Sequence, residues 1–216
     1  MRRTGCQFHW NNNNYKNFDD FLSTFSSSKR KQINRERRRV KEAGIKFQIL
    51  NGEMAVDEDW VNFHNLYEST FEKKGGMPTL TLDFFQSIAS KMPKEVLLVK
   101  ALYGKKVVAA AFNLVGDETL YGRHWGCSEE FHSLHFEACY YQGLQFCIDN
   151  GLKKFEPGAQ GEHKISRGFL PTPTWSYHWM QNDFFQRNIK QYLKDEHEGM
   201  IDYMKELNEH SPYKIL

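Results

Sequence analysis

Residues 155–171 contain the densest group of side chains that could perform chemistry. The segment has three glycines and two prolines, so we expect a loop whose backbone can approach a ligand closely. Its groups for proton transfer and charge are Glu156, Glu162, His163, Lys164 and Arg167. A solvated surface loop is the alternative interpretation. We favour a functional loop, because a predicted strand at residues 154–156 and an aromatic run at residues 174–179 would hold it between packed elements.

Proton transfer and anion binding are the chemistry that this loop could support. Glu156 and His163 are candidate bases, since an imidazole titrates near neutral pH without further help. The candidate anion-binding groups are Lys164, Arg167 and Arg123, with Gln160 as an orienting amide. An internal ion pair between Glu156 and Arg123 is the alternative to a catalytic role for Glu156.

A basic helix is predicted at residues 29–43, ending at Gly44. Seven cations within residues 29–39, in a helix with two glutamates, form the strongest charge cluster of the chain: Lys29, Arg30, Lys31, Arg35, Arg37, Arg38 and Arg39. A helix would place Lys31, Arg35 and Arg38 on one stripe. This stripe predicts phosphate binding or, equally, a solvated helix face.

A metal site is not expected. His132, His135 and Glu137 could join Glu162 and His163 as ligands, but their spacing is not diagnostic and no HExxH motif occurs. We expect His135 instead to begin a helix and to point towards the loop, so it is a third candidate catalytic residue.

Composition indicates a soluble cytoplasmic protein with one sizeable domain. Aromatic residues make up 15% of the 216 residues and charged residues 26%, which is typical of a globular chain with a polar surface. The four cysteines form no CxxC pair, as expected in a reducing compartment. No apolar run is long enough for a membrane span, and the first residues lack the apolar stretch of a secretory signal.

The elements that must position the loop alternate between helices and strands. We expect a poorly fixed loop or docked edge segment at residues 1–17, where Phe8 and Trp10 would be buried. Helices are predicted at residues 18–25, 29–43, 57–74, 82–92, 134–150 and 184–207, and an interruption near Gly199 is an alternative for the last of them. Strands are predicted at residues 45–50, 96–103, 106–115, 119–127 and 154–156, of which the middle three form an antiparallel meander. We divide the chain into an N-terminal segment, residues 1–28, and one domain, residues 29–216.

This order predicts an α+β fold with a mixed, mostly antiparallel central sheet flanked by helices. It is the order of the GNAT acyltransferase core, in which the central strands splay to admit an acyl donor. Four stretches further resemble the FemAB-like family of predicted bacterial N-acyltransferases: SKRKQINRERR (28–38), LYGRHWGC (120–127), LHFEACYYQG (134–143) and EPGAQGEHK (156–164).

The resemblance implies transfer of an acyl group from acyl-CoA, or of an aminoacyl group from aminoacyl-tRNA, to an amine. The acceptor would be a small molecule or a peptidoglycan precursor. Such a transfer needs a base and groups that stabilise the oxyanion of the tetrahedral intermediate. The candidate substrate- or donor-binding residues are Arg123, His124, Glu137, Gln160, Glu162, Lys164, Arg167, Arg35 and Arg38.

Two other functions stay open at this point. Members of the family usually resemble two GNAT-like halves in tandem, and this chain resembles the second half only. The chain is therefore also compatible with a fragment or split protein that pairs with a missing N-terminal half, or with itself, as a structural half-domain. The other alternative is a non-catalytic module that binds RNA or phosphate through the basic helix.

Overall fold

The computed structural model describes residues 1–159 and 161–214, which divide into two compact units. One unit is continuous in sequence, Asn11–Pro157, and the other combines Met1–Trp10 with Gly158–Leu216. We call them the continuous unit and the split unit. The loop predicted at residues 155–171 contributes to both. The boundary expected after residue 28 is a different division of the chain and stays a prediction.

A five-stranded sheet forms the centre of the continuous unit. Its strands lie in the order β2 (Ile45–Asn51), β3 (Val96–Tyr103), β4 (Lys106–Val115), β5 (Thr119–Cys127) and β6 (Lys154–Glu156). Neighbours from β2 to β5 are antiparallel, and β6 is parallel to β5. The predicted meander, and the α+β class with a mixed, mostly antiparallel sheet, are therefore confirmed.

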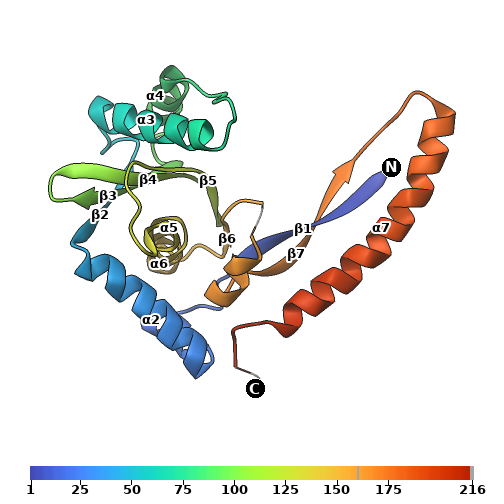
Figure 1. Cartoon of the computed structure of the whole chain (residues 1–216), viewed down its shortest axis with the longest axis horizontal. Coiled ribbons are helices and arrows are strands. Elements are labelled where there is room, and N and C mark those ends of the chain that lie inside the picture. The colour runs from blue at the N-terminus through green and yellow to red at the C-terminus, as the bar shows by residue number, and fades with distance from the viewer. Residues whose placement is uncertain (160, 215–216) are drawn as a thin grey trace. The chain divides into compact units, whose positions relative to one another are not determined.

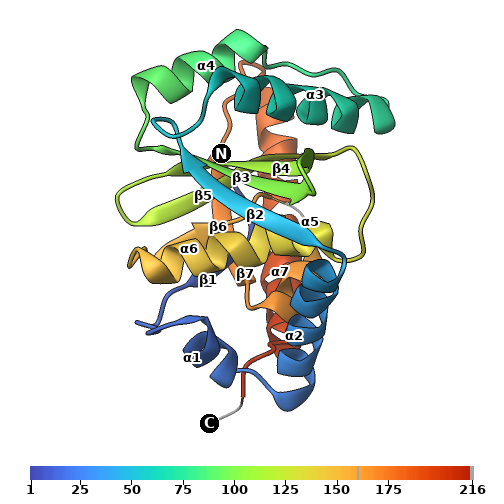
Figure 2. The same ribbon diagram turned by 90° about the vertical axis from the view of Figure 1, so that its left-hand side faces the viewer.

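Helices cover both faces of this sheet (Figures 1 and 2). On one face lie α3 (Asp57–Lys73) and α4 (Leu82–Lys91), and the other face carries α2 (Ser27–Glu42) and the helix that follows β5. Alternate side chains of the strands point to opposite faces, so each face has its own apolar cluster. The first cluster contains Trp60, Phe63, Phe85, Leu98 and Phe112, and the second contains Val40, Ile45, Ala101, Val108 and Leu134. The short helix α1 (Phe18–Ser23) was also predicted correctly.

Helix α3 packs directly on the backbone of β5. The Thr70 hydroxyl donates to the Trp125 carbonyl at 3.0 Å, and the Lys73 ammonium donates to the Cys127 carbonyl at 3.0 Å. Gly126 lies between these two carbonyls. A Cβ at this glycine would lie 2.0 Å from the Leu66 carbonyl oxygen, so only glycine allows the helix to approach this closely.

The helix predicted at residues 134–150 is composite. It begins as α5 (Leu134–Phe136), widens into the π-helical turn η1 (Glu137–Tyr141) and continues as α6 (Gln142–Asp149). In the π-helical turn the N–H of Gln142 donates to the carbonyl of Glu137, five residues before it. The helix itself is confirmed, whereas its π-helical turn was not predicted; such turns are frequent at functional sites.

The split unit is a two-stranded antiparallel ribbon with a long helix beside it (Figure 1). Strand β1 (Arg2–Asn11) pairs with β7 (Leu170–Tyr177), from Arg2 opposite Tyr177 to His9 opposite Leu170. The prediction of a loop at residues 1–17 is therefore wrong where β1 forms. Phe8 and Trp10 are buried, as expected for the alternative of a docked segment. The pairing partner of this polar stretch lies far along the chain, so its local sequence gives no strand signal.

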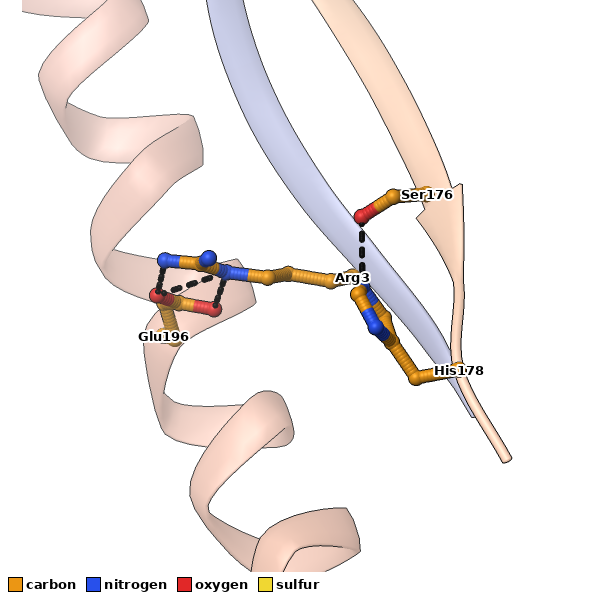
Figure 3. A network of polar contacts seen from close by, with 4 residues as sticks. All are labelled: Arg3, Ser176, His178 and Glu196. Atoms are coloured by element: carbon orange, nitrogen blue, oxygen red, sulfur yellow. Dashed lines mark hydrogen bonds and ion pairs between the residues drawn. The ribbon is translucent and has the colours of Figure 1, made fainter. Parts of the chain in front are cut away.

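Helix α7 (Asp183–Glu209) is continuous through Gly199, so the predicted interruption is wrong. Asn182 caps its first turn by accepting from the N–H groups of Phe184 and Phe185. Arg3 of β1 donates to both carboxylate oxygens of Glu196 at 2.6–3.1 Å (Figure 3), and the Thr4 hydroxyl lies 2.9 Å from the His197 ring. Polar contacts thus fix the helix to the ribbon. Within residues 1–159 and 161–214, none of the helices is both long and apolar enough to cross a bilayer.

Candidate active site

A cavity of about 550 Å³ lies in the split unit. It is lined from three segments that are distant in sequence: Cys6 and Phe8 of β1, Ala159, Gly161, Glu162 and His163 of the predicted loop, and Tyr203 of α7. Its volume is within the range of small-molecule sites. Two predicted site residues, Glu162 and His163, therefore line one cavity.

The loop supplies these residues from a short 3₁₀-helix, η2 (Glu162–Arg167), that the sequence did not predict. The pKa of His163 is lowered from the ordinary histidine value of 6.5, first by partial burial and then by the positive charges of Arg167 and Lys164. A lowered pKa keeps the imidazole neutral at pH 7. The ring is then able to accept a proton.

Gly161 leaves room for the His163 ring beside the loop backbone. Its φ is +112°, a conformation that favours glycine, and a Cβ here would lie 2.4 Å from His163 Cε1. Ring and loop backbone are thus in direct contact. No larger residue at position 161 can keep this arrangement.

Lys164 and Arg167 are buried, with 2% and 3% of their surface exposed. The Lys164 ammonium donates to the Gly158 carbonyl at 2.7 Å, and Arg167 Nη1 donates to the His163 carbonyl at 2.7 Å and to Ser166 Oγ at 3.2 Å. These bonds fasten η2 to the loop before it and place two positive charges near His163. A direct role in binding an anion stays a prediction for both residues.

Tyr203 closes the cavity from α7. Its hydroxyl donates to Glu162 Oε1 at 2.6 Å, and this bond raises the pKa of Tyr203 to about 12. Burial also raises the pKa of the Cys6 thiol, so the thiol is protonated at neutral pH. Sequence reasoning did not identify Cys6, Phe8 or Tyr203 as site residues, because only the packing of β1 and α7 brings them to the loop.

The predicted residues Glu156 and Arg123 belong to the continuous unit. Glu156 ends β6 and forms an ion pair with Lys154 at 2.7 Å. Arg123 is exposed on β5, with its guanidinium 5.0 Å from the Tyr121 ring centroid. Gln160 lies outside the described residues.

His124 and His135 pack among aromatic rings. The His124 ring lies 5.0 Å from Tyr67 and 6.4 Å from Phe112, centroid to centroid, and burial together with the charge of Arg123 lowers its pKa. His135 lies in the first turn of its helix, as predicted, 5.4 Å from the Trp125 ring and 5.3 Å from the Tyr140 ring. Roles in catalysis or donor binding stay predictions for both residues.

The remaining predicted residues come from α2 and η1. Arg35 and Arg38 are exposed on α2, on the stripe predicted with Lys31. Arg38 also lines a second cavity, of about 490 Å³, together with Glu137. Burial raises the pKa of Glu137, while the charge of Arg37 opposes this shift.

His163 is expected to titrate below pH 6.5. Since its pKa is lower in the folded chain than in the unfolded chain, its contribution to stability is present above pH 6.5 and is lost as the pH falls through the lowered value. A titration of the His163 ring protons by nuclear magnetic resonance measures this. A His163 midpoint at or above the ordinary value of 6.5 contradicts the expectation.

Comparisons with known proteins agree with this fold. A sequence profile of the FemAB-like family, described as peptidoglycan biosynthesis/recognition, matches residues 1–215. No curated protein sequence matches the chain significantly.

Solved structures with a similar fold include the C-terminal domain of a putative lysylphosphatidylglycerol synthetase from Agrobacterium fabrum. It aligns at 11% sequence identity and TM-score 0.54, and the alignment covers 73% of this chain and 48% of that one. L-PGS from Bacillus licheniformis aligns at 14% identity and TM-score 0.53, with the same two shares. FemX aligns at 12% identity and TM-score 0.54, over 72% of this chain and 53% of that one. The chain thus spans about half the length of these structures and shares their fold.

Proposed function

Because the chain belongs to the FemAB-like family, we propose that it is an N-acyltransferase that moves an acyl or aminoacyl group to an amine acceptor. The family is described by peptidoglycan biosynthesis and recognition, which supports a transferase role in cell-wall chemistry. The observation that carries the proposal is the His163 imidazole, which lines a cavity and has a lowered pKa.

In the proposed reaction, neutral His163 removes a proton from the ammonium group of the acceptor. The free amine attacks the carbonyl carbon of the donor, a thioester in acyl-CoA or an ester in aminoacyl-tRNA. The tetrahedral intermediate carries a negative charge, which the positive charges of Lys164 and Arg167 would stabilise. Its collapse breaks the C–S or C–O bond, the proton held by His163 passes to the leaving group, and the attacking nitrogen releases its remaining extra proton to solvent, which leaves the neutral amide.

His163 is favoured over the other two candidate bases by its surroundings. Glu156 forms an ion pair with Lys154, and His135 packs between the rings of Trp125 and Tyr140. Neither of them lines the cavity of the split unit. We therefore assign the base to His163 and keep Glu156 and His135 as residues to be tested beside it.

The donor is proposed to be acyl-CoA or aminoacyl-tRNA, without a metal ion. Both donors carry phosphates, and the exposed stripe of Lys31, Arg35 and Arg38 on α2 supplies cations for them. A cytoplasmic location belongs to the same proposal, since both donors are made in the cytoplasm. The same stripe would serve a non-catalytic phosphate- or RNA-binding module, and loss of turnover on His163 substitution separates the two functions.

A second candidate function is pairing with another half-domain or another copy. The split unit exposes more than half the surface of six aromatic side chains: Trp175, Tyr177, Trp179, Phe184, Phe185 and Tyr192. Large exposed apolar residues in such number mark interaction surfaces. Light scattering after size-exclusion chromatography tests this, because a monomer at micromolar concentration argues against self-pairing.

Donor binding is expected to raise the melting temperature of the purified chain. A ligand present at 100 times its Kd adds about 2.7 kcal/mol, which is roughly 5–10 °C for a chain of this size. Coenzyme A, acetyl-CoA and aminoacyl-tRNA would each be titrated at low and moderate salt, followed by mass spectrometry of amine acceptors. Stabilisation and amide formation support the proposal; stabilisation by deacylated tRNA alone, without product, favours the binding module.

A further inference from the structure

The second cavity, in the continuous unit, has the features of a separate ligand site. It lies between α2, β2 and η1, and its volume is about 490 Å³. The lining residues are Arg37, Arg38, Val40, Lys41, Ile45, Phe47, Glu137 and Gln142. The lining thus combines cations and one carboxylate with apolar side chains of α2 and β2.

Glu137 is the most informative of these residues. Only 4% of its surface is exposed. Its Oε1 atom accepts from Arg37 Nε at 3.2 Å and from Gln142 Nε2 at 2.7 Å. Its buried Oε2 atom has no hydrogen-bond partner among the described residues. A buried carboxylate oxygen without a donor is unfavourable, so a ligand that supplies one would gain affinity here.

The geometry around Glu137 is fixed from two sides. The Arg37 guanidinium lies 4.2 Å from the Phe18 ring centroid while it donates to Glu137, so this arginine is already engaged. On the other side, Glu137 is the first residue of the π-helical turn η1. The backbone hydrogen bond of this turn spans five residues, from Gln142 back to Glu137. The carboxylate is thus held in place before any ligand binds.

Two cations remain for the ligand. Lys41 is exposed at the cavity, and the contact of Arg38 with Glu42, 3.7 Å from nitrogen to oxygen, is exposed and weak. Since Arg37 balances Glu137, Arg38 and Lys41 leave a surplus of positive charge. This surplus favours an anion and disfavours an ammonium group, so the donor to Glu137 Oε2 should be uncharged, such as a hydroxyl.

We propose that this cavity binds a small sugar phosphate, with the phosphate at Arg38 and Lys41 and a sugar hydroxyl donating to Glu137. Two cations suit a phosphate monoester, which carries nearly two negative charges at neutral pH. The site contains neither His163 nor any other residue of the first cavity, and it shares Arg38 with the stripe of cations proposed for the donor phosphates.

Isothermal titration calorimetry of the full chain with ribose 5-phosphate, ribose and inorganic phosphate tests the proposal at low salt. Ribose 5-phosphate should bind at least fivefold more tightly than phosphate, and ribose more weakly than both. Lys41→Ala should weaken binding of ribose 5-phosphate at least fivefold. The matched control Lys31→Ala removes the same charge from an exposed position of α2 outside the cavity and should change binding less than twofold.

Glu137→Gln separates recognition of the hydroxyl from recognition of the phosphate. It should weaken ribose 5-phosphate about fivefold and leave phosphate within twofold, provided that circular dichroism shows an intact fold. Equal affinity for ribose 5-phosphate and phosphate in the unsubstituted chain would overturn the proposal, and so would equal effects of Lys41→Ala and Lys31→Ala. The two lysine variants keep the test decisive if Glu137→Gln does not fold.

Discussion

His163→Ala should lower kcat/KM for acyl transfer by roughly 100- to 10,000-fold, the usual contribution of a general base. The side chain lies at the cavity, so its removal takes away the proton acceptor without opening the core. Steady-state kinetics with a saturating donor measures the loss. His210→Ala, which truncates an exposed histidine at the C-terminal end of α7, is the matched control and should retain full activity.

The pH profile distinguishes a base from a structural residue. In the unsubstituted chain, activity should persist as the pH falls through 6.5 and decline only near the lowered pKa of His163. The His163→Ala variant should lose most of its activity, and its remaining activity should no longer decline near this pKa. If the variant keeps both, another group is the base, and Glu156→Gln and His135→Ala become the next variants.

Gly126→Ala is the substitution with the largest expected effect on stability. The added Cβ would lie 2.0 Å from the Leu66 carbonyl oxygen and 2.3 Å from its carbon. Both atoms belong to the backbone of α3, so relief requires that the helix move away from β5. We expect a loss of about 3 kcal/mol, at the upper end of overpacking effects, and a melting temperature lower by roughly 6–12 °C.

Gly199→Ala is the control for this prediction and should have the opposite sign. Gly199 lies inside α7, and a Cβ there would meet no atom within 4 Å. Alanine is favoured over glycine in a helix interior by up to about 1 kcal/mol. Chemical denaturation of both variants measures the difference, and equal stability of Gly126→Ala and the unsubstituted chain would mean that α3 does not pack on β5 in this way.

The elements of the continuous unit were predictable because their signals are local. The strands at residues 96–103, 106–115 and 119–127 are separated by glycine-containing turns, and the helices around them show apolar residues at helical spacing. The π-helical turn at Glu137 was not predictable. It adds one residue to a turn of an otherwise regular helix, and helical propensities do not distinguish such a turn from an α-helical one.

The split unit shows the opposite case. Strand β1 pairs with β7, which lies far along the chain. Its own polar sequence carries no strand pattern. For the same reason the loop of the candidate active site could be found from its own glycines and charged residues, whereas Cys6 and Tyr203 could not. Their place in the cavity follows from long-range packing of β1 and α7 against that loop.

The pairing of β1 with β7 also has a consequence during protein synthesis. Arg2 faces Tyr177, so most of the chain must leave the ribosome before the ribbon can form. At typical translation rates of about 5–20 residues per second, this takes roughly 10–35 s. The continuous unit is complete by Pro157 and can fold first, while β1 still lacks its partner β7. Until β7 emerges, Phe8 and Trp10, which are buried in the folded chain, are available for non-native apolar contacts.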